Sequence, residues 1–382
     1  MNPLYLLFSL VFLVYVDVRI LAPILPSISA SLGSSPGAVG LAMTSYSLTY
    51  GFGQLVYGPL SDRVGRIAVI RTAAIGFCLF TVLSALAMTT WQFITVRLVA
   101  GAFAGAVIPL TMVFIGDTVA YGRRQVVLGY VFAVSSVATV FSASMGGALA
   151  YFVSWRMMLL GYGLLTLIPL FILWRIETGR PVVASGNPGR YRDFLHDRYA
   201  LFIYAGVFLE GFLLWGGMTY IGSFATVRYG LDQFTVGVMI AVFGLGTMVG
   251  GLTVGKISRR MSENVQAALG GLLMGCSFLA LIPRLPSWVF AISMFTLGMG
   301  VVGLHTILQL RGTEISDKAR GKAFSLFAVG NFSGIAAGSA AFGWLINAGR
   351  YEAMLLVAGL GLITTGLTTA LAPRHHRRNP AA

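Results

Sequence analysis

Long apolar runs, separated by short polar stretches, dominate the chain from end to end. Each run covers about 20 to 25 residues, and a helix of that length crosses the ~30 Å hydrocarbon core of a bilayer. The pattern therefore predicts an all-α polytopic membrane protein with twelve transmembrane helices. The predicted spans lie near residues 4–29, 36–60, 67–89, 91–117, 124–151, 155–176, 198–227, 234–257, 264–283, 287–310, 319–347 and 351–372.

The longest polar stretch divides these helices into two groups of six. It contains prolines and glycines, which are typical of linkers. We expect an N-terminal six-helix bundle over 1–176, a cytoplasmic linker over 177–197, a C-terminal six-helix bundle over 198–372 and a basic cytoplasmic tail over 373–382.

The two halves resemble each other at a constant offset of 197 residues. The matched positions are Gly58, Ser61 and Arg63 with Gly255, Ser258 and Arg260, Gly101 with Gly298, and Asp117 and Arg123 with Glu314 and Arg320. This repeat predicts two pseudo-symmetric bundles, an arrangement found in transporters that rock one half against the other around a central site.

Composition excludes a water-soluble globule, because 57% of the 382 residues are hydrophobic and 10% are charged, against about 25% charged in soluble domains. The positions of the basic residues along the chain explain the net charge of +14. Of the 26 basic residues, twenty lie on alternate connections and four, Arg156, Arg228, Arg284 and Arg350, on the opposite set. This bias predicts that both termini lie on the cytoplasmic side of a bacterial inner membrane. It also accounts for the net positive charge without a nucleic-acid partner.

Chemical motifs of enzymes are absent from the sequence. No P-loop, zinc-ligand cluster or nucleophile elbow occurs, and Cys78 and Cys276 fall inside apolar runs, where they pack as small hydrophobes. We therefore expect no catalytic residue, no metal and no cofactor. An ion gradient, rather than ATP, is the expected source of energy.

The loop between the second and third spans reads Gly58-Pro59-Leu60-Ser61-Asp62-Arg63-Val64-Gly65-Arg66. It resembles the signature loop G-x-x-x-D-R-x-G-R of the major facilitator superfamily, and with the twelve spans the resemblance covers essentially the whole chain. It implies that Gly58, Asp62, Arg63, Gly65 and Arg66 form a latch between the cytoplasmic faces of the halves when the cavity opens outward. Asp117 is the expected acidic partner of a loop arginine. The alternative is that these residues only anchor loops at the headgroups.

Other segments are similar to the proton-coupled drug-efflux branch of that superfamily. Asp17 with Leu25 and Pro26 matches its first helix. Arg97, Gly101 and Gly105 match the R-x-x-x-G-x-x-x-G motif, whose arginine is linked to proton coupling. The fifth helix departs from the branch pattern G-x-x-x-G-P-x-x-G-G, because it has Ala138, Ser142, Ala143, Gly146 and Gly147 at these positions.

Four ionisable residues lie within predicted spans, namely Asp17, Arg19, Arg97 and Glu210. Each costs at least ~2.5 kcal/mol at the bilayer centre, so each is a functional candidate. We expect all four at one depth in a common polar cavity, with Arg97 as the partner of Asp17, because Asp17 and Arg19 are on different helix faces. A carboxylate that exchanges an arginine for water or substrate can bind and release a proton. Asp17, Glu210 and Arg97 are therefore the candidate proton-coupling residues.

Candidate substrate-binding residues are Asp17, Arg19, Glu210, Trp215, Tyr46 and Asn331, with His305 as a weaker candidate. Structural alternatives remain for several of them: Glu210 as a protonated carboxyl between helices, Arg19 as a fixed counter-ion, Arg97 as a structural tie, and the aromatic residues as packing or interface anchors.

Together these features predict a monomeric secondary transporter that moves a small organic molecule by alternating access. Efflux in exchange for protons is the leading prediction. The alternatives are proton-coupled uptake of a nutrient or organic anion, which the two intramembrane arginines would suit, and a non-transporting membrane receptor or scaffold.

Overall fold

The computed structural model describes residues 3–175, 191–316 and 320–372, and these residues form helices joined by short connections. The helices are α1 (Pro3–Ser31), α2 (Pro36–Val64), α3 (Arg66–Ala85), α4 (Thr90–Thr118), α5 (Tyr121–Phe152), α6 (Trp155–Leu165), α7 (Leu167–Trp174), α8 (Tyr191–Phe194), α9 (Arg198–Glu210), η1 (Gly211–Trp215), α10 (Gly216–Tyr229), α11 (Gln233–Ile257), α12 (Glu263–Leu279), α13 (Trp288–Glu314), α14 (Arg320–Asn347) and α15 (Tyr351–Leu371). The five residues of η1 form a π-helical turn that continues α9 into α10.

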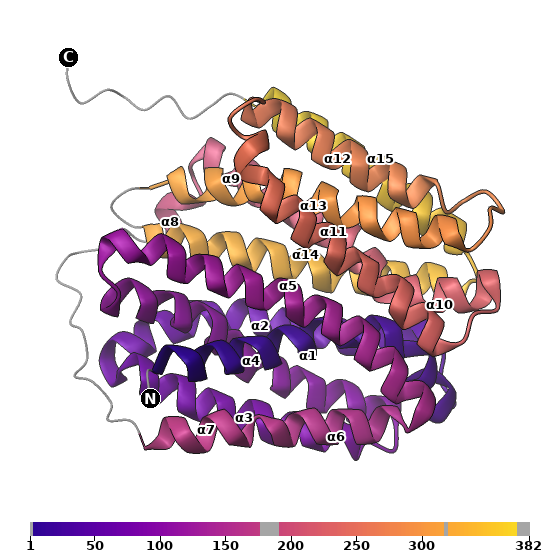
Figure 1. Ribbon diagram of the computed structural model, residues 1–382, viewed down its shortest axis with the longest axis horizontal. Coiled ribbons are helices and arrows are strands. Elements are labelled where there is room, and N and C mark those ends of the chain that lie inside the picture. Colours follow the sequence, from indigo (N-terminus) through magenta and orange to yellow (C-terminus); the bar gives the residue numbers. More distant parts are fainter. Residues whose placement is uncertain (1–2, 176–190, 317–319, 373–382) are drawn as a thin grey trace.

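Two groups of helices lie side by side (Figure 1), with α1 to α7 in one and α9 to α15 in the other. In the first group α2 packs on α4, and α3 packs on α4 and α6. In the second group α11 packs on α13, and α12 packs on α13 and α15. The same order of neighbours therefore recurs in both halves. Between the halves, α2 packs on α14, α5 on α11 and α1 on α10.

The offset of 197 residues recurs in the packing of two helix crossings. A Cβ atom on Gly101 of α4 would overlap the carbonyl oxygen of Tyr46 on α2, and a Cβ atom on Gly298 of α13 would overlap the carbonyl oxygen of Phe243 on α11. Both members of each pair are separated from their counterparts by the same offset. Small residues permit such close crossings in membrane bundles.

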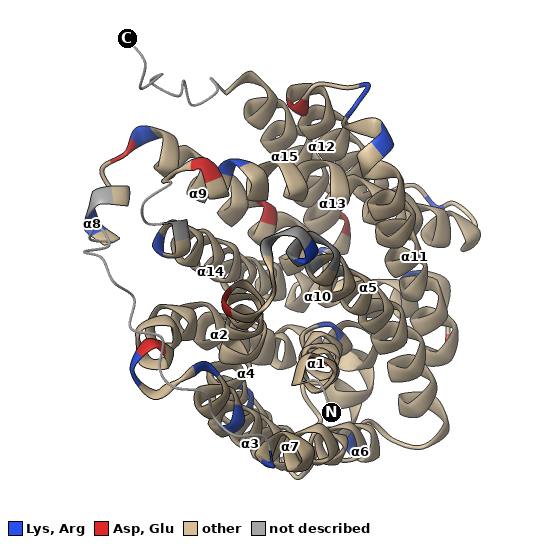
Figure 2. Ribbon diagram, turned by 60° about the vertical axis from the view of Figure 1, so that its left-hand side comes forward, with Lys and Arg blue, Asp and Glu red and all other residues tan. Residues whose placement is uncertain are grey.

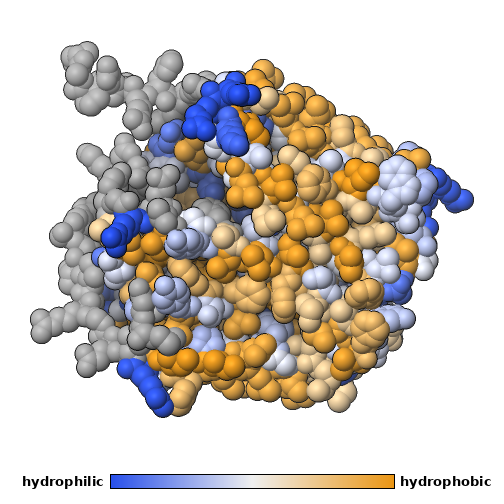
Figure 3. Space-filling view, in the orientation of Figure 1, coloured by the Kyte–Doolittle hydropathy of each residue, from blue (hydrophilic) through white to orange (hydrophobic). Residues whose placement is uncertain are grey.

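Among the described residues, ten segments are long and apolar enough to cross a membrane: Pro3–Ser31, Arg66–Ala85, Thr90–Thr118, Gly129–Phe152, Trp155–Trp174, Arg198–Tyr229, Gln233–Ile257, Trp288–Glu314, Gly321–Asn347 and Tyr351–Leu371. Helices α2 and α12 occupy the other two expected spans, but α2 is rich in Gly, Ser, Thr and Tyr and α12 has 17 residues. The number twelve therefore stays a prediction. Figure 3 shows an apolar surface across the middle of the molecule and hydrophilic residues toward both ends.

The end of the molecule that carries Pro3 and Leu371 is here called the inner end, and the opposite end the outer end. The inner end lies on the left of Figure 1 and comes forward in Figure 2, where charged residues gather on the helix ends and connections. The positive-charge bias predicts that the inner end faces the cytoplasm. Residues 177–190 of the expected linker and the whole expected tail (373–382) lie outside the described residues.

The two halves meet closely at the outer end. Ser27 of α1 donates a hydrogen bond to Gln233 of α11, and the amide of Gly37 on α2 donates to Oδ1 of Asn347 at 3.0 Å. A Cβ atom on Gly147 of α5 would lie 2.8 Å from the Cα of Gly237 on α11.

Toward the inner end, several glycines make no comparable contact. A Cβ atom on Gly58, Gly129, Gly251, Gly255 or Gly321 would meet no other atom within 4 Å. These five glycines therefore form no close helix crossing at the inner end.

Candidate functional site

Asp17 of α1 and Arg97 of α4 form an ion pair inside the first half. Their Oδ1 and Nη1 atoms lie 2.6 Å apart, and the side chains are 0% and 2% exposed. The hydroxyl of Tyr162 on α6 also donates a hydrogen bond to Oδ1 of Asp17. Arg97 further lies over the ring of Tyr46, with its Cζ 4.3 Å from the ring centroid. The expected partnership of Asp17 with Arg97 is thus confirmed, whereas Tyr162 was not anticipated.

Glycines position this pair. Gly101 follows Arg97 by one helical turn and touches the backbone of Tyr46, and a Cβ on Gly105 would lie 2.5 Å from the carbonyl oxygen of Tyr50. Helix α4 can therefore lie directly against α2, which brings the buried guanidinium of Arg97 onto the face of the Tyr46 ring.

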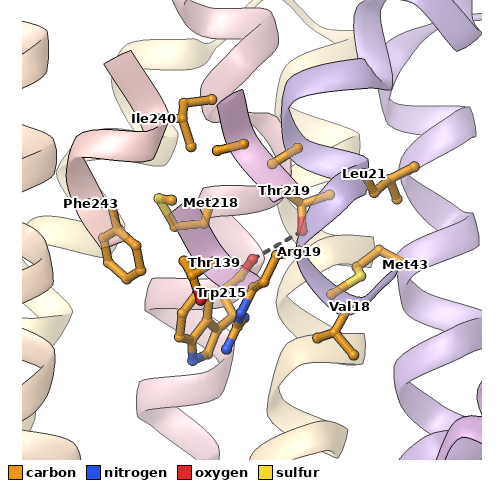
Figure 4. A pocket seen from close by; sticks show the side chains of 12 residues that line it. Val18, Arg19, Leu21, Met43, Thr139, Trp215, Met218, Thr219, Ile240 and Phe243 are labelled. Atoms are coloured by element: carbon orange, nitrogen blue, oxygen red, sulfur yellow. Dashed lines mark hydrogen bonds between the residues drawn. The ribbon is translucent and has the colours of Figure 1, made fainter. Parts of the chain in front are cut away.

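Arg19 of α1 reaches across to the second half. Its Cζ lies 3.2 Å from the centroid of the Trp215 ring, a cation–π contact between the halves. Figure 4 shows this pair at a cavity lined also by Val18, Leu21, Ala22, Met43, Thr139, Ala143, Met218, Thr219, Ile240 and Phe243. The cavity volume is about 30 Å³, enough for one or two water molecules. A small organic molecule therefore does not fit this cavity in the present conformation.

Glu210 lies in the second half, at the last residue of α9. Its Oε2 is 2.8 Å from Nδ1 of His305 on α13, and the two side chains are 0% and 28% exposed. The π-helical turn begins at the next residue, and such turns are frequent at functional sites. A Cβ on Gly211 would lie 3.0 Å from Oδ1 of Asn331, so α14 packs directly against this turn.

The four intramembrane charges therefore occupy three places rather than one cavity. Asp17 and Arg97 pair within the first half, Glu210 meets His305 within the second, and of the four only Arg19 lines the cavity between the halves. The expected common cavity is not formed in this conformation, because helix packing buries each carboxylate within its own half.

Several polar atoms of these groups are buried without a hydrogen-bond partner in the described chain. They are Oδ2 of Asp17, Oη of Tyr46, Nε of Arg97, Oε1 of Glu210 and Oδ1 of Asn331. Buried polar atoms are normally paired, so these five atoms of the candidate residues mark places where water or another polar group can bind.

The signature loop is tied to its own half. Arg66 contacts Oδ1 of Asp62 at 2.5 Å and Oδ2 of Asp117 at 3.2 Å. Arg66 also donates to the hydroxyl of Ser61 at 2.5 Å. Asp117 is therefore the acidic partner of a loop arginine, as expected. Gly65, at φ 101°, supplies the turn between α2 and α3. Arg63 is exposed.

Comparison with known proteins identifies the family. Residues 7–315 match the Major Facilitator Superfamily, and the chain belongs to this superfamily. The uncharacterized MFS-type transporter YceJ of Bacillus subtilis (strain 168) is 26% identical over 362 residues, which cover 92% of this chain and 91% of that protein. A probable sugar efflux transporter of Helicobacter pylori (strain J99) is 24% identical over 333 residues, covering 85% of this chain and 82% of that protein.

Solved structures share the fold. The crystal structure of the nucleoside transporter NupG has a TM-score of 0.79 at 13% identity and covers 97% of this chain and 99% of its own. A bacterial homologue of the human lysosomal transporter Spinster, solved in an inward-facing and unoccupied conformation, has a TM-score of 0.71 at 16% identity, with 97% and 93% covered. The relatives are transporters, so the chain is a multi-pass membrane protein of a transporter family rather than an enzyme. A restriction to the drug-efflux branch is not shown, because the relatives include the probable sugar efflux transporter and also a putative metabolite transport protein of Haemophilus influenzae.

Proposed function

We propose that this protein is a monomeric proton-coupled transporter of the bacterial inner membrane that exports a small organic molecule by alternating access. The observation that carries the proposal is the ion pair between Asp17 and Arg97, buried at 0% and 2% exposure on two different helices of one half. A structural role alone is a weak explanation for such a pair, because taking two charges out of water costs several kcal/mol per ion.

Asp17 is the proposed proton carrier. Arg97 and Tyr162 both contact Oδ1 of Asp17; in the proposed cycle this is the state in which the carboxyl has released its proton. A tilt of the bundle that withdraws Arg97 leaves a charge in an apolar site, and proton uptake removes that charge. Protonation and conformation are thereby linked, since each protonation state favours one position of α4 relative to α1.

Glu210 is the proposed second coupling residue. His305 contacts it and is 28% exposed, so the imidazole lies between the buried carboxylate and the inner side. The π-helical turn after Glu210 provides a weak point where α9 and α10 can turn relative to each other.

Substrate binding is proposed for Arg19, Trp215, Tyr46 and Asn331 together with the two carboxylates. Separation of the halves would enlarge the cavity at Arg19 and Trp215. The signature loop is proposed as the latch of the outward-facing state, in which Asp62, Arg63 and Arg66 would meet the second half. In the present conformation Arg66 is held by Asp62 and Asp117 of its own half.

The direction of export follows the relatives described as probable sugar efflux transporters. The second candidate is proton-coupled uptake of an organic anion, and the guanidinium of Arg19 on the cavity between the halves favours it.

The test uses purified protein in vesicles with an imposed pH gradient, screened for movement of sugars, nucleosides, organic anions and cationic drugs. We expect flux that follows the gradient in the native protein and loses this dependence in Asp17→Asn and Glu210→Gln. Glu314→Gln, which alters an exposed carboxylate on α13, is the matched control. Gradient-driven flux that both site variants retain would refute the coupling role, and the charge of the transported compound separates the two candidates.

A further inference from the structure

A wide pocket of about 770 Å³ opens at the outer end of the second half. It is lined by the last turn of α10, the connection between α12 and α13, and the start of α15. Arg228, Arg284 and Arg350 all line it. These are three of the four arginines on the connections that the sequence places outside. An end that is otherwise poor in positive charge therefore concentrates it in one pocket.

Two of these three arginines are uncompensated. Arg228 contacts Oε1 of Glu352 at 3.2 Å and donates to the carbonyl oxygen of Ile282 at 2.5 Å. Arg284 and Arg350 are exposed and form no ion pair with any residue in the described ranges. The pocket thus has a fixed guanidinium in its wall and two further guanidinium groups at its surface, against one carboxylate that is 61% exposed.

Further donors face the same region. Helix α15 begins at Tyr351 without a side-chain cap from Arg350, and its first residues line the pocket. The first amides of a helix are unpaired and favour negative charge. Nε of Arg228 and Oη of Tyr229 are buried and have no hydrogen-bond partner within the described chain. Donors therefore exceed acceptors in the pocket.

We infer that this pocket binds an oxyanion, a phosphate or carboxylate group presented from the outer side, because planar guanidinium groups recognise these oxygens in pairs. The group belongs either to an anionic phospholipid headgroup or to a free anion. Leu285 in the wall and Trp288 just beyond it are 41% and 60% exposed, which sets the pocket at the level of the membrane interface. Arg228 follows Glu210 by 18 residues along α9, η1 and α10, so about 27 Å of helix separates the pocket from that carboxylate.

The test needs a local readout, since basic residues at the inner end also attract anionic lipid. In a background with Cys78→Ser and Cys276→Ser, the Leu285→Cys variant is labelled with an environment-sensitive dye. The protein in neutral detergent is titrated with phosphatidylglycerol, phosphatidylcholine and glycerol 1-phosphate. We expect saturable dye responses to phosphatidylglycerol, with phosphatidylcholine at least about tenfold weaker.

Arg284→Gln/Arg350→Gln is the test variant, and we expect it to weaken the response to phosphatidylglycerol about tenfold. The control is Arg259→Gln/Arg260→Gln, which removes two exposed arginines at the inner end and leaves the response unchanged. A response to glycerol 1-phosphate as well identifies a free anion as a sufficient ligand, and a response to the lipid alone identifies the headgroup. The inference is overturned if neither anion changes the dye signal, or if the test and control variants respond alike.

Discussion

Arg97 holds Asp17 across 80 residues of sequence, with 2.6 Å between Nη1 and Oδ1 and with almost no exposure of either side chain. The two residues lie on α4 and α1, so any motion of one helix against the other changes the distance between the charges. The interaction between the two charges therefore depends directly on how α1 and α4 are packed in the first half.

Removal of Arg97 alone is expected to destabilise the protein strongly. Arg97→Leu leaves the carboxylate of Asp17 buried and unpaired, a change that costs about 3–5 kcal/mol for buried pairs. The double variant Asp17→Asn/Arg97→Leu removes both charges and should recover a large part of this loss. Unfolding of the purified variants in detergent measures the effect. If the losses in free energy of unfolding for Asp17→Asn and Arg97→Leu simply added up in the double variant, the ion pair would contribute no coupling energy.

Two glycines of α4 are expected to respond oppositely to alanine. Gly101→Ala forces a Cβ into the carbonyl of Tyr46 and should lower the melting temperature. Gly116→Ala meets no atom within 4 Å and should leave it unchanged or raise it, since alanine favours helix by about 1 kcal/mol over glycine. Equal melting temperatures for the two variants would contradict the close crossing of α2 and α4.

Thiol cross-linking tests the closed outer end. In a background without Cys78 and Cys276, the pair Ser27→Cys/Gln233→Cys should react quickly with a short bifunctional reagent, because the native side chains are hydrogen-bonded. The pair Gly58→Cys/Ser325→Cys, at the inner ends of α2 and α14, should react slowly. Fast reaction of the inner pair in the resting protein would mean that the inner end is closed.

The cap of α11 provides a pH-dependent contribution outside the membrane. The carboxylate of Asp232 accepts hydrogen bonds from the backbone amide and the hydroxyl of Thr235, and these lower the pKa of Asp232. Since the folded protein holds this carboxyl below its usual pKa of about 3.9, its stabilising effect is complete above that value and is lost as the pH falls through the lower folded pKa.

Asp232→Asn keeps a good cap without a titrating group, so it should flatten the acid limb of a stability curve measured by melting in detergent. Asp232→Ala should cost about 1 kcal/mol at neutral pH. An unchanged acid limb in the asparagine variant would exclude this residue as its source.

Sequence patterns were sufficient for the helical architecture and for the ion pair between Asp17 and Arg97, and the resemblance of the loop motif led to the ion pair between Arg66 and Asp117. The rarity of intramembrane charge singled out Asp17 and Arg97, and their estimated depths brought them together. Tyr162 could not be found in this way, because a tyrosine in a span has no distinctive signal and its contact depends on how α6 rotates against α1. His305, the partner of Glu210, was only a weak candidate from the sequence for a related reason. His305 lies nearer the inner end of its helix than Glu210 does, and the lengths of the two side chains make up this difference in depth.

The arrangement of the charges into separate places also escaped prediction. Spacing along a helix gives depth but not the direction in which a side chain points once neighbouring helices have packed. Arg19 and Asp17 are two residues apart, yet the first stacks on Trp215 of the other half and the second stays within its own half. The rotation of α1 about its own axis decides which half each of these side chains contacts, and the sequence pattern does not specify that rotation.

The glycine contacts between α5 and α11 bear on how easily the protein can change shape. Gly147 and Gly237 meet backbone to backbone, so no side chain interlocks at this one crossing, while the rings of Phe152 and Phe234 meet between the same two helices. At the glycine crossing itself the helices can part without a change of rotamer. Under the proposed alternating access, this crossing would be a point where the outer end opens.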